Sequence, residues 1–366
     1  MNTEAELPYE AWIVALLTLP KMGPSRLSAL LAEHDAQSAW RRLCSGQPVD
    51  LDQVKSDTVQ AWRQAARAMA VDEHWHAIDS LGISVSELGS SQYPERLGLD
   101  IEPPQILFGL GTPLGSKPTV GIVGTRQCTS YGQRCAFELG AALANAGVHV
   151  VSGLALGIDA AAHQGALSAT TEHRAYPVGV VGSGLDIVYP KQNASLWGRV
   201  GREGVLYSET APGVGPAAWR FPARNRIIAG LSDAVIVIES HERGGSLLTV
   251  DEAQLRDVPV GAVPGPITSN AAAGSNRLLV DGATPVLGVD DIFSMIGFSP
   301  PRIIDSTEDP DEVTSALLDA VGWTPTTLEQ LCLRTSLSIA EVAAEIERLV
   351  LLGAVARSGQ WLERTR

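Results

Sequence analysis

The middle of the chain alternates short apolar runs with stretches of helical spacing. Two stretches, Tyr131–Ala146 and Ile158–Ala169, repeat apolar residues every three to four positions, which predicts amphipathic helices. The apolar runs are rich in Val and Ile without regular polar alternation, as is typical of strands buried on both faces. These runs are Val120–Val123, Val148–Ser152, Val178–Val181, Val205–Ser208, Ala234–Glu239 and Val260–Val263. This order predicts an α/β fold with a doubly wound parallel sheet.

Different patterns flank this middle part. The N-terminal segment has helical spacing over Tyr9–Leu19, Ser25–Glu33 and Thr58–Ile78. The C-terminal segment has three short helical patterns, then Ala354–Arg357, a Ser-Gly turn and Gln360–Glu363, which is the outline of a winged helix. A proline-rich acidic segment separates it from the middle part. We therefore predict a helical module at 1–85, a core domain at 86–298, a linker at 299–312 and a winged-helix-like module at 313–366.

The charge balance at first disfavours a nucleic-acid-binding protein. The 366 residues include 27 Lys and Arg against 41 Asp and Glu, a net charge of -14. The acidic excess is concentrated in the two flanking segments, however. Over residues 174–226 the chain carries Arg174, Lys191, Arg199, Arg202, Arg220, Arg224 and Arg226 against Asp186, Glu203 and Glu209. The charge pattern therefore allows one locally basic site in the core and disfavours duplex binding by the flanking modules.

Cysteine usage and the N-terminus indicate a cytoplasmic protein. The four cysteines form no CxxC pair, so the sequence suggests neither a zinc site nor a disulfide framework. The first six residues are acidic and lack the basic start of a signal peptide. No apolar run approaches the roughly 18–20 residues that span a bilayer. We expect a cytoplasmic location without membrane insertion.

Polar and glycine-rich loops follow the predicted strands. Since the carboxyl ends of parallel strands meet at one edge of a sheet, these loops should converge there. Their glycines let backbone amides approach a ligand, their hydroxyl groups donate to anions, and their arginines grip phosphate. Any one loop is as consistent with a plain structural turn, but together they predict an extended phosphate-binding surface. The loops begin at Gly124, Ser152, Gly182, Phe221, Gly244 and Pro264.

Several other kinds of site are disfavoured. The chain has no P-loop, no dinucleotide-binding glycine pattern and no nucleophile elbow. Asp159 and His163 share a helical spacing, which favours a local hydrogen bond at the helix start over a metal site. Glu209 and Glu239 are candidates for acid–base groups, but we favour a role in orienting Arg224 or Arg226. We predict no metal and no cofactor.

The loops together resemble the DNA processing protein A (DprA/Smf) family. Two blocks carry most of the resemblance: Ser-Gly-Leu-Ala-x-Gly-Ile-Asp from Ser152, and Phe-Pro-x-Arg-Asn-Arg-Ile-Ile from Phe221. Gly124-Thr-Arg, Gly182-Ser-Gly-Leu-Asp with Tyr-Pro-Lys191, Gly245-Ser-Leu-x-Thr and Pro264-Gly match in order and spacing over about residues 90–290. The family usually has Ser-Gly-Ser-Leu where this chain has Gly-Gly-Ser-Leu, which removes one hydroxyl donor.

The resemblance implies a Rossmann-like core that binds single-stranded DNA and forms a homodimer. The family protects incoming strands in natural transformation and loads the RecA recombinase on them, without established catalysis. Carried over by motif, Arg126 and Lys191 would contact phosphates, and the other site residues would line the groove. These are Ser152, Gly153, Leu154, Ala155, Gly157, Gly182, Ser183, Gly184, Arg224, Asn225, Arg226, Gly245, Ser246 and Thr249. Tyr189, Phe221 and Trp197 are candidates for stacking on bases.

The flanking modules match the family more loosely. Leu19–Arg26 resembles the turn of a helix-hairpin-helix, or SAM-like, module, with Lys21 where such hairpins usually have glycine. A DNA contact and a plain turn remain equally open there. The predicted recognition helix Ile339–Leu352 carries three glutamates against Arg348, and phosphates would repel it. We favour a protein-interaction or dimer-stabilising role for this module.

Two rival functions remain. Gly244–Glu252 faintly resembles the catalytic loop of nucleoside-monophosphate phosphoribohydrolases of the lysine-decarboxylase-like group, but without its leading proline and the glycine before threonine. In that enzyme Glu252 would be catalytic, and release of free base from a nucleotide would identify it. A purely structural interaction protein would leave the cluster of basic residues without a partner.

Overall fold

The computed structural model describes residues 7–49, 51, 54–300, 312–322, 325–351, 354–359 and 361–364. The chain forms two compact units, Met1–Pro300 and Pro301–Arg366. Most of the predicted linker 299–312 lies outside the described residues. The predicted boundary between residues 85 and 86 would cut a strand, because Ser84–Glu87 pairs with the sheet of the core.

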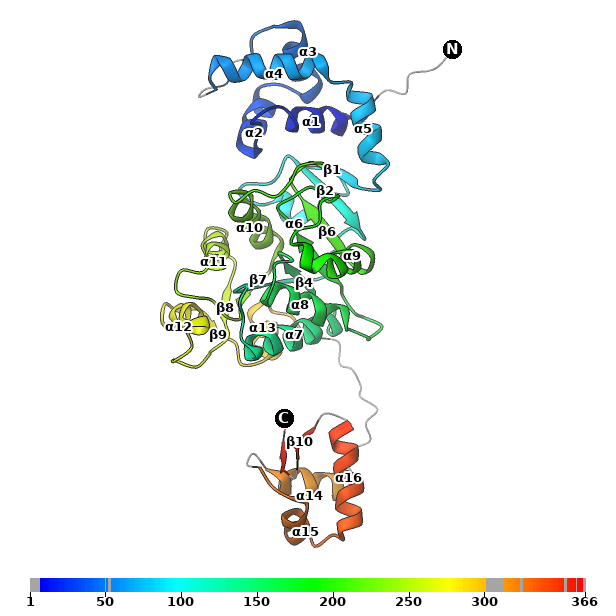
Figure 1. The fold of residues 1–366 in the computed structure, drawn as a ribbon, viewed down its shortest axis with the longest axis vertical. Coiled ribbons are helices and arrows are strands. Elements are labelled where there is room, and N and C mark those ends of the chain that lie inside the picture. The colour runs from blue at the N-terminus through cyan, green and yellow to red at the C-terminus, as the bar shows by residue number, and fades with distance from the viewer. Residues whose placement is uncertain are drawn as a thin grey trace. The chain divides into compact units, whose positions relative to one another are not determined.

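A nine-stranded sheet forms the centre of the first unit (Figure 1). Its order is β1-β2-β6-β5-β4-β3-β7-β8-β9, in which β2 is antiparallel to both of its neighbours and all other neighbouring strands are parallel. The strands are β1 (Ser84–Glu87), β2 (Ile106–Gly111), β3 (Thr119–Val123), β4 (His149–Ser152), β5 (Pro177–Val180), β6 (Val205–Ser208), β7 (Ala234–Val237), β8 (Val260–Ala262) and β9 (Thr284–Pro285). The central strands β3 to β7 are buried along their whole length, which explains their unbroken Val and Ile runs.

Helices cover both faces of this sheet, as a doubly wound fold requires (Figure 1). One face packs α7 (Ser130–Asn145), α8 (Ile158–Leu167) and α13 (Val289–Met295) against β3, β4 and β7. The other face packs α6 (Glu95–Gly98), α10 (Arg220–Leu231) and α11 (Leu247–Gln254). The other helical elements of the core domain are η1 (Lys191–Asn193), α9 (Ala194–Glu203), η2 (Asn270–Ala272) and α12 (Ala273–Val280).

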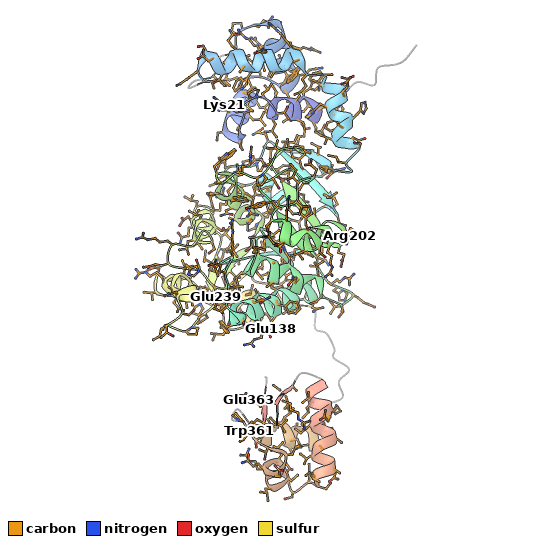
Figure 2. All side chains as sticks on the ribbon, in the orientation of Figure 1. Lys21, Glu138, Arg202, Glu239, Trp361 and Glu363 are labelled. Atoms are coloured by element: carbon orange, nitrogen blue, oxygen red, sulfur yellow. The ribbon has the colours of Figure 1, made fainter. Side chains whose placement is uncertain are left out.

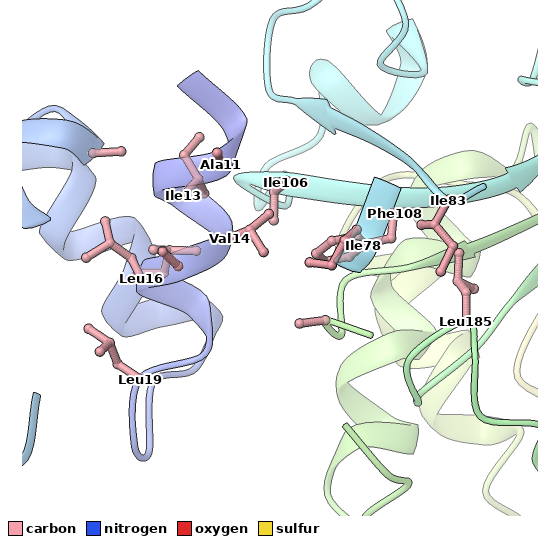
Figure 3. Packing of buried hydrophobic residues seen from close by; sticks show 14 of the residues in the cluster. Ala11, Ile13, Val14, Leu16, Leu19, Ile78, Ile83, Ile106, Phe108 and Leu185 are labelled. Carbon is pink, nitrogen blue, oxygen red and sulfur yellow. The ribbon is translucent and has the colours of Figure 1, made fainter. Parts of the chain in front are cut away.

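A layer of five helices packs on the β2 end of the sheet. These are α1 (Tyr9–Leu17), α2 (Pro24–Glu33), α3 (Ala36–Ser45), α4 (Ser56–Ala68) and α5 (Val71–Asp79). Val14 and Leu16 of α1 belong to the same buried apolar cluster as Ile106 and Phe108 of β2 (Figure 3). This helical module and the core therefore share one hydrophobic core.

The structure confirms the six predicted strands and the predicted helices, with ends within about two residues for most of them. The pattern Thr58–Ile78 forms two helices rather than one, because the backbone becomes extended at Met69. Helix α3 was not predicted, although the chain carries its signals: Asp35 accepts a hydrogen bond from the Ser38 amide, and Gly46 ends the helix at φ +79. The antiparallel strands β1 and β2 were also not predicted, and they extend the parallel sheet.

The second unit has the predicted winged-helix outline. Three helices, α14 (Glu312–Val321), α15 (Leu328–Thr335) and α16 (Ile339–Leu351), precede a hairpin of β10 (Val355–Ser358) and β11 (Trp361–Arg364). The acidic helix α16 pairs Glu345 with Arg348, while Glu347 pairs with Arg357 of the hairpin. Within the described ranges of both units, no helix is long and apolar enough to cross a membrane.

Candidate nucleic-acid interface

An open crevice of about 870 Å³ lies at the carboxyl ends of the parallel strands. It sits between β3 and β7, where the chain has finished one half of the sheet and crosses over to build the other. Ligands of open α/β sheets bind at this point, because the loops of the two halves diverge and leave space between them. The loops after β3, β4 and β7 line it together with the start of α10. With Tyr189 from the loop after β5, five of the six predicted loops thus contribute to one site.

Arg126 and two aromatic rings stand at the mouth of this crevice. The rings of Tyr189 and Phe221 stack with centroids 5.4 Å apart. The guanidinium carbon of Arg126 lies 5.5 Å from the centre of the Phe221 ring, and the residue is exposed. A cation beside aromatic faces suits a chain of bases and phosphates. Beside these stacked rings lies an inner pocket that Gly182 and Arg224 also line.

The structure discriminates among the three aromatic candidates. Trp197 is 4 % exposed and belongs to the apolar cluster beneath α9, so no base can reach its ring. Tyr189 keeps 40 % of its area exposed. Lys191 is exposed and lines neither the crevice nor the inner pocket, although its neighbours Pro190 and Gln192 line the inner pocket.

Arg224 lies at the floor of the site and is 8 % exposed. Its guanidinium donates to the carbonyl oxygens of Gly153, at 2.9 Å, and Val180. The buried carboxylate of Asp159 lies close enough to counter the effect of burial, which lowers the pKa of Arg224 to about 10. Asp159 in turn accepts from the amides of Gly153 and Ala155. Backbone carbonyls therefore hold Arg224, while Glu239 bonds Thr129 and His163 bonds the carbonyl of Val178 rather than Asp159.

The loop after β4 shapes the site more than it lines it. Ser152 and Leu154 are fully buried, and the Ser152 hydroxyl donates to the Ile122 carbonyl at 2.6 Å. A side chain at Gly153 would strike the guanidinium of Arg224 at 2.5 Å. Gly157 has φ +79, and a side chain there would overlap the carbonyl oxygen of Thr125. Of the predicted residues in this loop, Gly153 and Ala155 face the crevice or its inner pocket.

In the remaining loops, too, some predicted residues line the site and others pack away from it. Gly182 and Ser183 line the inner pocket, and Asn225, Gly245, Ser246 and Thr249 line the outer crevice. Gly184 packs against the backbone of Ala211 instead. Around Gly245 a side chain would meet nothing within 4 Å, and around Gly182 its nearest contacts would be at 3.4 Å. These two glycines leave the backbone open toward the crevice.

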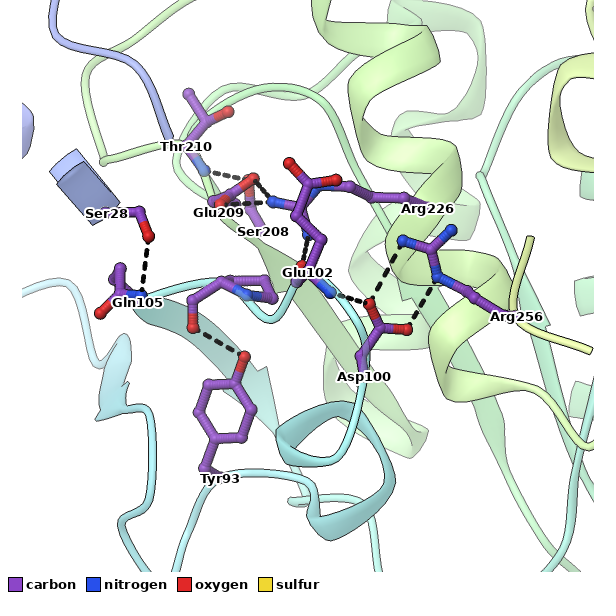
Figure 4. A network of polar contacts seen from close by, with 11 residues as sticks. Ser28, Tyr93, Asp100, Glu102, Gln105, Ser208, Glu209, Thr210, Arg226 and Arg256 are labelled. Atoms are coloured by element: carbon purple, nitrogen blue, oxygen red, sulfur yellow. Dashed lines mark hydrogen bonds and ion pairs between the residues drawn. The ribbon is translucent and has the colours of Figure 1, made fainter. Parts of the chain in front are cut away.

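Arg226 does not line the crevice, and its guanidinium points to Glu209 instead (Figure 4). Both of its contacts to Glu209 are 2.7 Å, and it also donates to the Glu102 carbonyl at 2.6 Å. Residues two apart on a helix point about 200° from one another, so α10 cannot direct both Arg224 and Arg226 into one groove. The predicted groove position of Arg226 is therefore corrected, whereas the predicted pairing of an arginine with Glu209 is confirmed.

Glu239 and Glu252 likewise have structural partners. Glu239 accepts from the amide and the hydroxyl of Thr129 at 2.8 and 2.6 Å, which fixes the start of α7 and the loop that carries Arg126. Glu252, the catalytic residue of the rival enzyme, pairs with Arg256 and does not line the crevice. The same Arg256 bonds the buried Asp100 at 2.8 Å.

Two buried histidines, one in β4 and one in α8, predict a loss of stability in mild acid. Burial lowers the pKa of His149 and of His163 to about 4, against about 6.5 in an unfolded chain. Between these values the unfolded chain binds more protons, so the free energy of unfolding falls as the pH falls from about 6.5 to 4. We expect urea unfolding of His163→Gln to depend less on pH in this range.

Comparison with known proteins identifies the family. A family model described as DNA recombination-mediator protein A matches residues 84–297, and a DprA winged helix domain model matches residues 286–359. The DNA processing protein DprA of Bacillus subtilis is 35% identical over 269 residues, covering 72% of this chain and 86% of that protein. This protein belongs to the DNA processing protein A family. Its Streptococcus pneumoniae relative is 39% identical over 207 residues, 56% of this chain and 72% of the relative.

Solved structures of the family have the same fold. The X-ray structure of Streptococcus pneumoniae DprA superposes with a TM-score of 0.64 at 28% identity, covering 78% of this chain and 96% of that one. Helicobacter pylori DNA processing protein A, whose structure concerns a single-stranded DNA binding mode, gives 0.52 at 28% identity, covering 58% of this chain and 95% of that one. The Rossmann-like core predicted from the resemblance is thus confirmed.

Proposed function

We propose that this protein binds single-stranded DNA in the crevice and presents it to the RecA recombinase during transformation and recombination. The observation that carries the proposal is the exposed Arg126 beside the stacked rings of Tyr189 and Phe221. Phosphates would meet Arg126 and Lys191, while bases would stack on Phe221 or Tyr189. The single-stranded DNA named for the Helicobacter pylori relative supports the choice of ligand.

The shape and side chains of the crevice favour single-stranded DNA as the ligand over duplex DNA. Its aromatic rings offer stacking surfaces that paired and stacked bases cannot use without leaving the duplex. Gly182 and Gly245 let the strand approach the backbone closely. Gly153, Ala155, Ser183, Asn225, Ser246 and Thr249 remain in the proposed site, with Arg224 as its buried floor.

The remaining parts of the proposal rest on the family. A description as a recombination mediator supports loading of RecA, and we propose a homodimer through the core and a cytoplasmic location. We also propose that the site binds without catalysis. Among the described residues that line the crevice, Asp159 carries the one carboxylate, and it is hydrogen-bonded and buried beside Arg224. No cluster of metal-binding side chains occurs within the described part of the chain.

Salt-dependent titrations test the proposed site. Arg126→Ala and Lys191→Ala should each weaken binding to single strands of any sequence, since phosphate contacts carry no base information. A charge-assisted hydrogen bond contributes about 1.5–3 kcal/mol, so we expect a loss of about tenfold or more. The slope of log affinity against log salt should fall by about 0.7 for each lost phosphate contact.

The matched control is Arg202→Ala, which removes an exposed arginine of α9 outside the crevice. Fluorescence anisotropy with single-stranded and duplex oligonucleotides of equal length supplies the measurement. Unchanged affinity and slope in both crevice variants would show that the DNA lies elsewhere.

A further inference from the structure

A second depression lies beside the crevice, across the start of α10. Trp219 and Arg220 of the core line it, together with Met22, Gly23 and Pro24 from the turn between α1 and α2. It shares Gly182 and Arg224 with the inner pocket of the crevice. The depression thus extends the crevice toward the helical module, beyond residues 84–297 that match the family model.

Trp219 offers an aromatic surface at this depression. The side chain is 56% exposed, although it is the largest apolar side chain of the 20 amino acids. The guanidinium carbon of Arg220 lies 4.6 Å from the ring centre, and Arg220 is itself fixed by a 2.9 Å hydrogen bond to the Gly215 carbonyl. Arg220 therefore supports the indole from one side and adds a positive charge beside it. An exposed and supported indole is a suitable surface for stacking a base.

The turn between α1 and α2 adds two further cations. Lys21 has φ +59 and is exposed at the tip of the turn (Figure 2). The exposed Arg26 donates to the Lys21 carbonyl at 2.5 Å. Within the described ranges neither side chain forms an ion pair with a carboxylate. Both cations thus remain available to phosphates.

The one carboxylate among the described residues of the depression does not oppose this charge. It belongs to Glu209, which is held by both of its oxygens to Arg226 at 2.7 Å. Arg220, Lys21 and Arg26 therefore leave this path positive, in a chain whose net charge is -14.

We propose that a DNA strand leaving the crevice crosses the start of α10, stacks a base on Trp219 and places phosphates against Lys21 and Arg26. This inference rests on the proposed function, because the crevice holds the first part of the strand. It assigns the Lys21 turn, left open from the sequence, as the second part of one continuous single-strand path. Longer strands then bind more tightly than those that fill the crevice alone.

Oligonucleotides of two lengths test this path in the full-length protein. We compare about 5 and about 15 deoxythymidines, since single-strand sites take about 4–16 nucleotides. Trp219→Ala should weaken binding of the longer strand about fivefold or more and leave the shorter strand within twofold. Trp219→Phe should keep most of the affinity, because it keeps an aromatic face. The control Trp361→Ala removes a comparably exposed tryptophan, 46% against 56%, from the second unit.

Two further measurements do not depend on the Trp219→Ala variant. DNA should quench the tryptophan emission of the wild-type protein more than that of Trp219→Phe. Lys21→Ala with Arg26→Ala should lower the salt slope for the longer strand by about 1.4, at about 0.7 per phosphate, and not for the shorter one.

The outcomes separate this inference from the proposed function. Binding of neither length by the wild-type protein would overturn both. Normal binding of the shorter strand with equal affinity of wild type and Trp219→Ala for the longer one would overturn the path alone. An equal loss for both lengths would place Trp219 within the first site and would also overturn it.

Discussion

Replacing Arg226 by methionine should lower the free energy of unfolding by about 3–5 kcal/mol at neutral pH. The change leaves the carboxylate of Glu209, whose side chain is 13% exposed, without its partner, and an unpaired buried charge costs about this much. Burial already raises the pKa of Glu209, so in the variant this carboxyl is protonated more readily. The deficit should therefore shrink as the pH falls, because a protonated Glu209 needs no cation. Urea unfolding at several pH values measures both effects.

Single-strand affinity provides the second readout for Arg226. Since its guanidinium faces Glu209 and Glu102 rather than the crevice, the folded Arg226→Met protein should bind DNA within twofold of wild type. The double variant Arg226→Met with Glu209→Gln should regain much of the stability, because the buried charge is removed with its partner. A large loss of affinity in a stably folded Arg226→Met protein would contradict the assignment and return this arginine to the DNA groove.

The second large effect is expected for Gly157→Ala. Gly157 has φ +79, a conformation that costs other residues about 1–3 kcal/mol. The new methyl group would also overlap the carbonyl of Thr125, next to the residue that carries the exposed guanidinium at the crevice mouth. We expect a loss of about 3 kcal/mol or more in the free energy of unfolding. The loop of Arg126 must also move, so DNA affinity should fall as well, measured by urea unfolding and anisotropy.

Gly182→Ala is the matched control for Gly157→Ala. Gly182 lies outside the left-handed region, and its new methyl group would meet Arg220 and Phe221 at an ordinary 3.4 Å. Stability should change by less than about 1 kcal/mol. If DNA passes over this glycine, affinity should nevertheless fall, because the methyl group enters the inner pocket. Equal stability of the Gly157→Ala and wild-type proteins would refute the packing role of Gly157.

The comparison of sequence and structure has one main pattern and one exception, the missed strand β2, whose first four residues form a buried run like those that were predicted. Strands β3 to β8 were predicted because burial on both faces leaves an apolar run that no loop or surface helix resembles. The short antiparallel strand β1 was missed, since only Ser86 of its four residues is buried and no run forms. Helix α3 was missed although its buried residues Ala36, Ala39, Trp40 and Leu43 follow helical spacing, so the sequence carried both a face and cap signals that were not read.

The sequence predicted which loops form the candidate site, but not which residues of each loop face it. Residues that follow parallel strands must meet at one edge of the sheet, so Arg126, Gly182 and Gly245 could be placed together from order alone. Which side of a loop or helix each residue faces depends on local geometry. Ser152, Leu154 and Gly184 follow the same strands and yet pack inward.

The sequence by itself determined the doubly wound core, the family and the set of loops at the strand ends, because strand burial and glycine-rich turns leave patterns within a few neighbouring residues. Only the tertiary structure decided which side chains of those loops share a space. The helical turn of α10 separates Arg224 from Arg226, and packing under α9 removes Trp197. Folding brings Tyr189 against Phe221, and Trp219 beside the Lys21 turn. These residues are far apart in the sequence, so no pattern of neighbouring residues predicts that they meet.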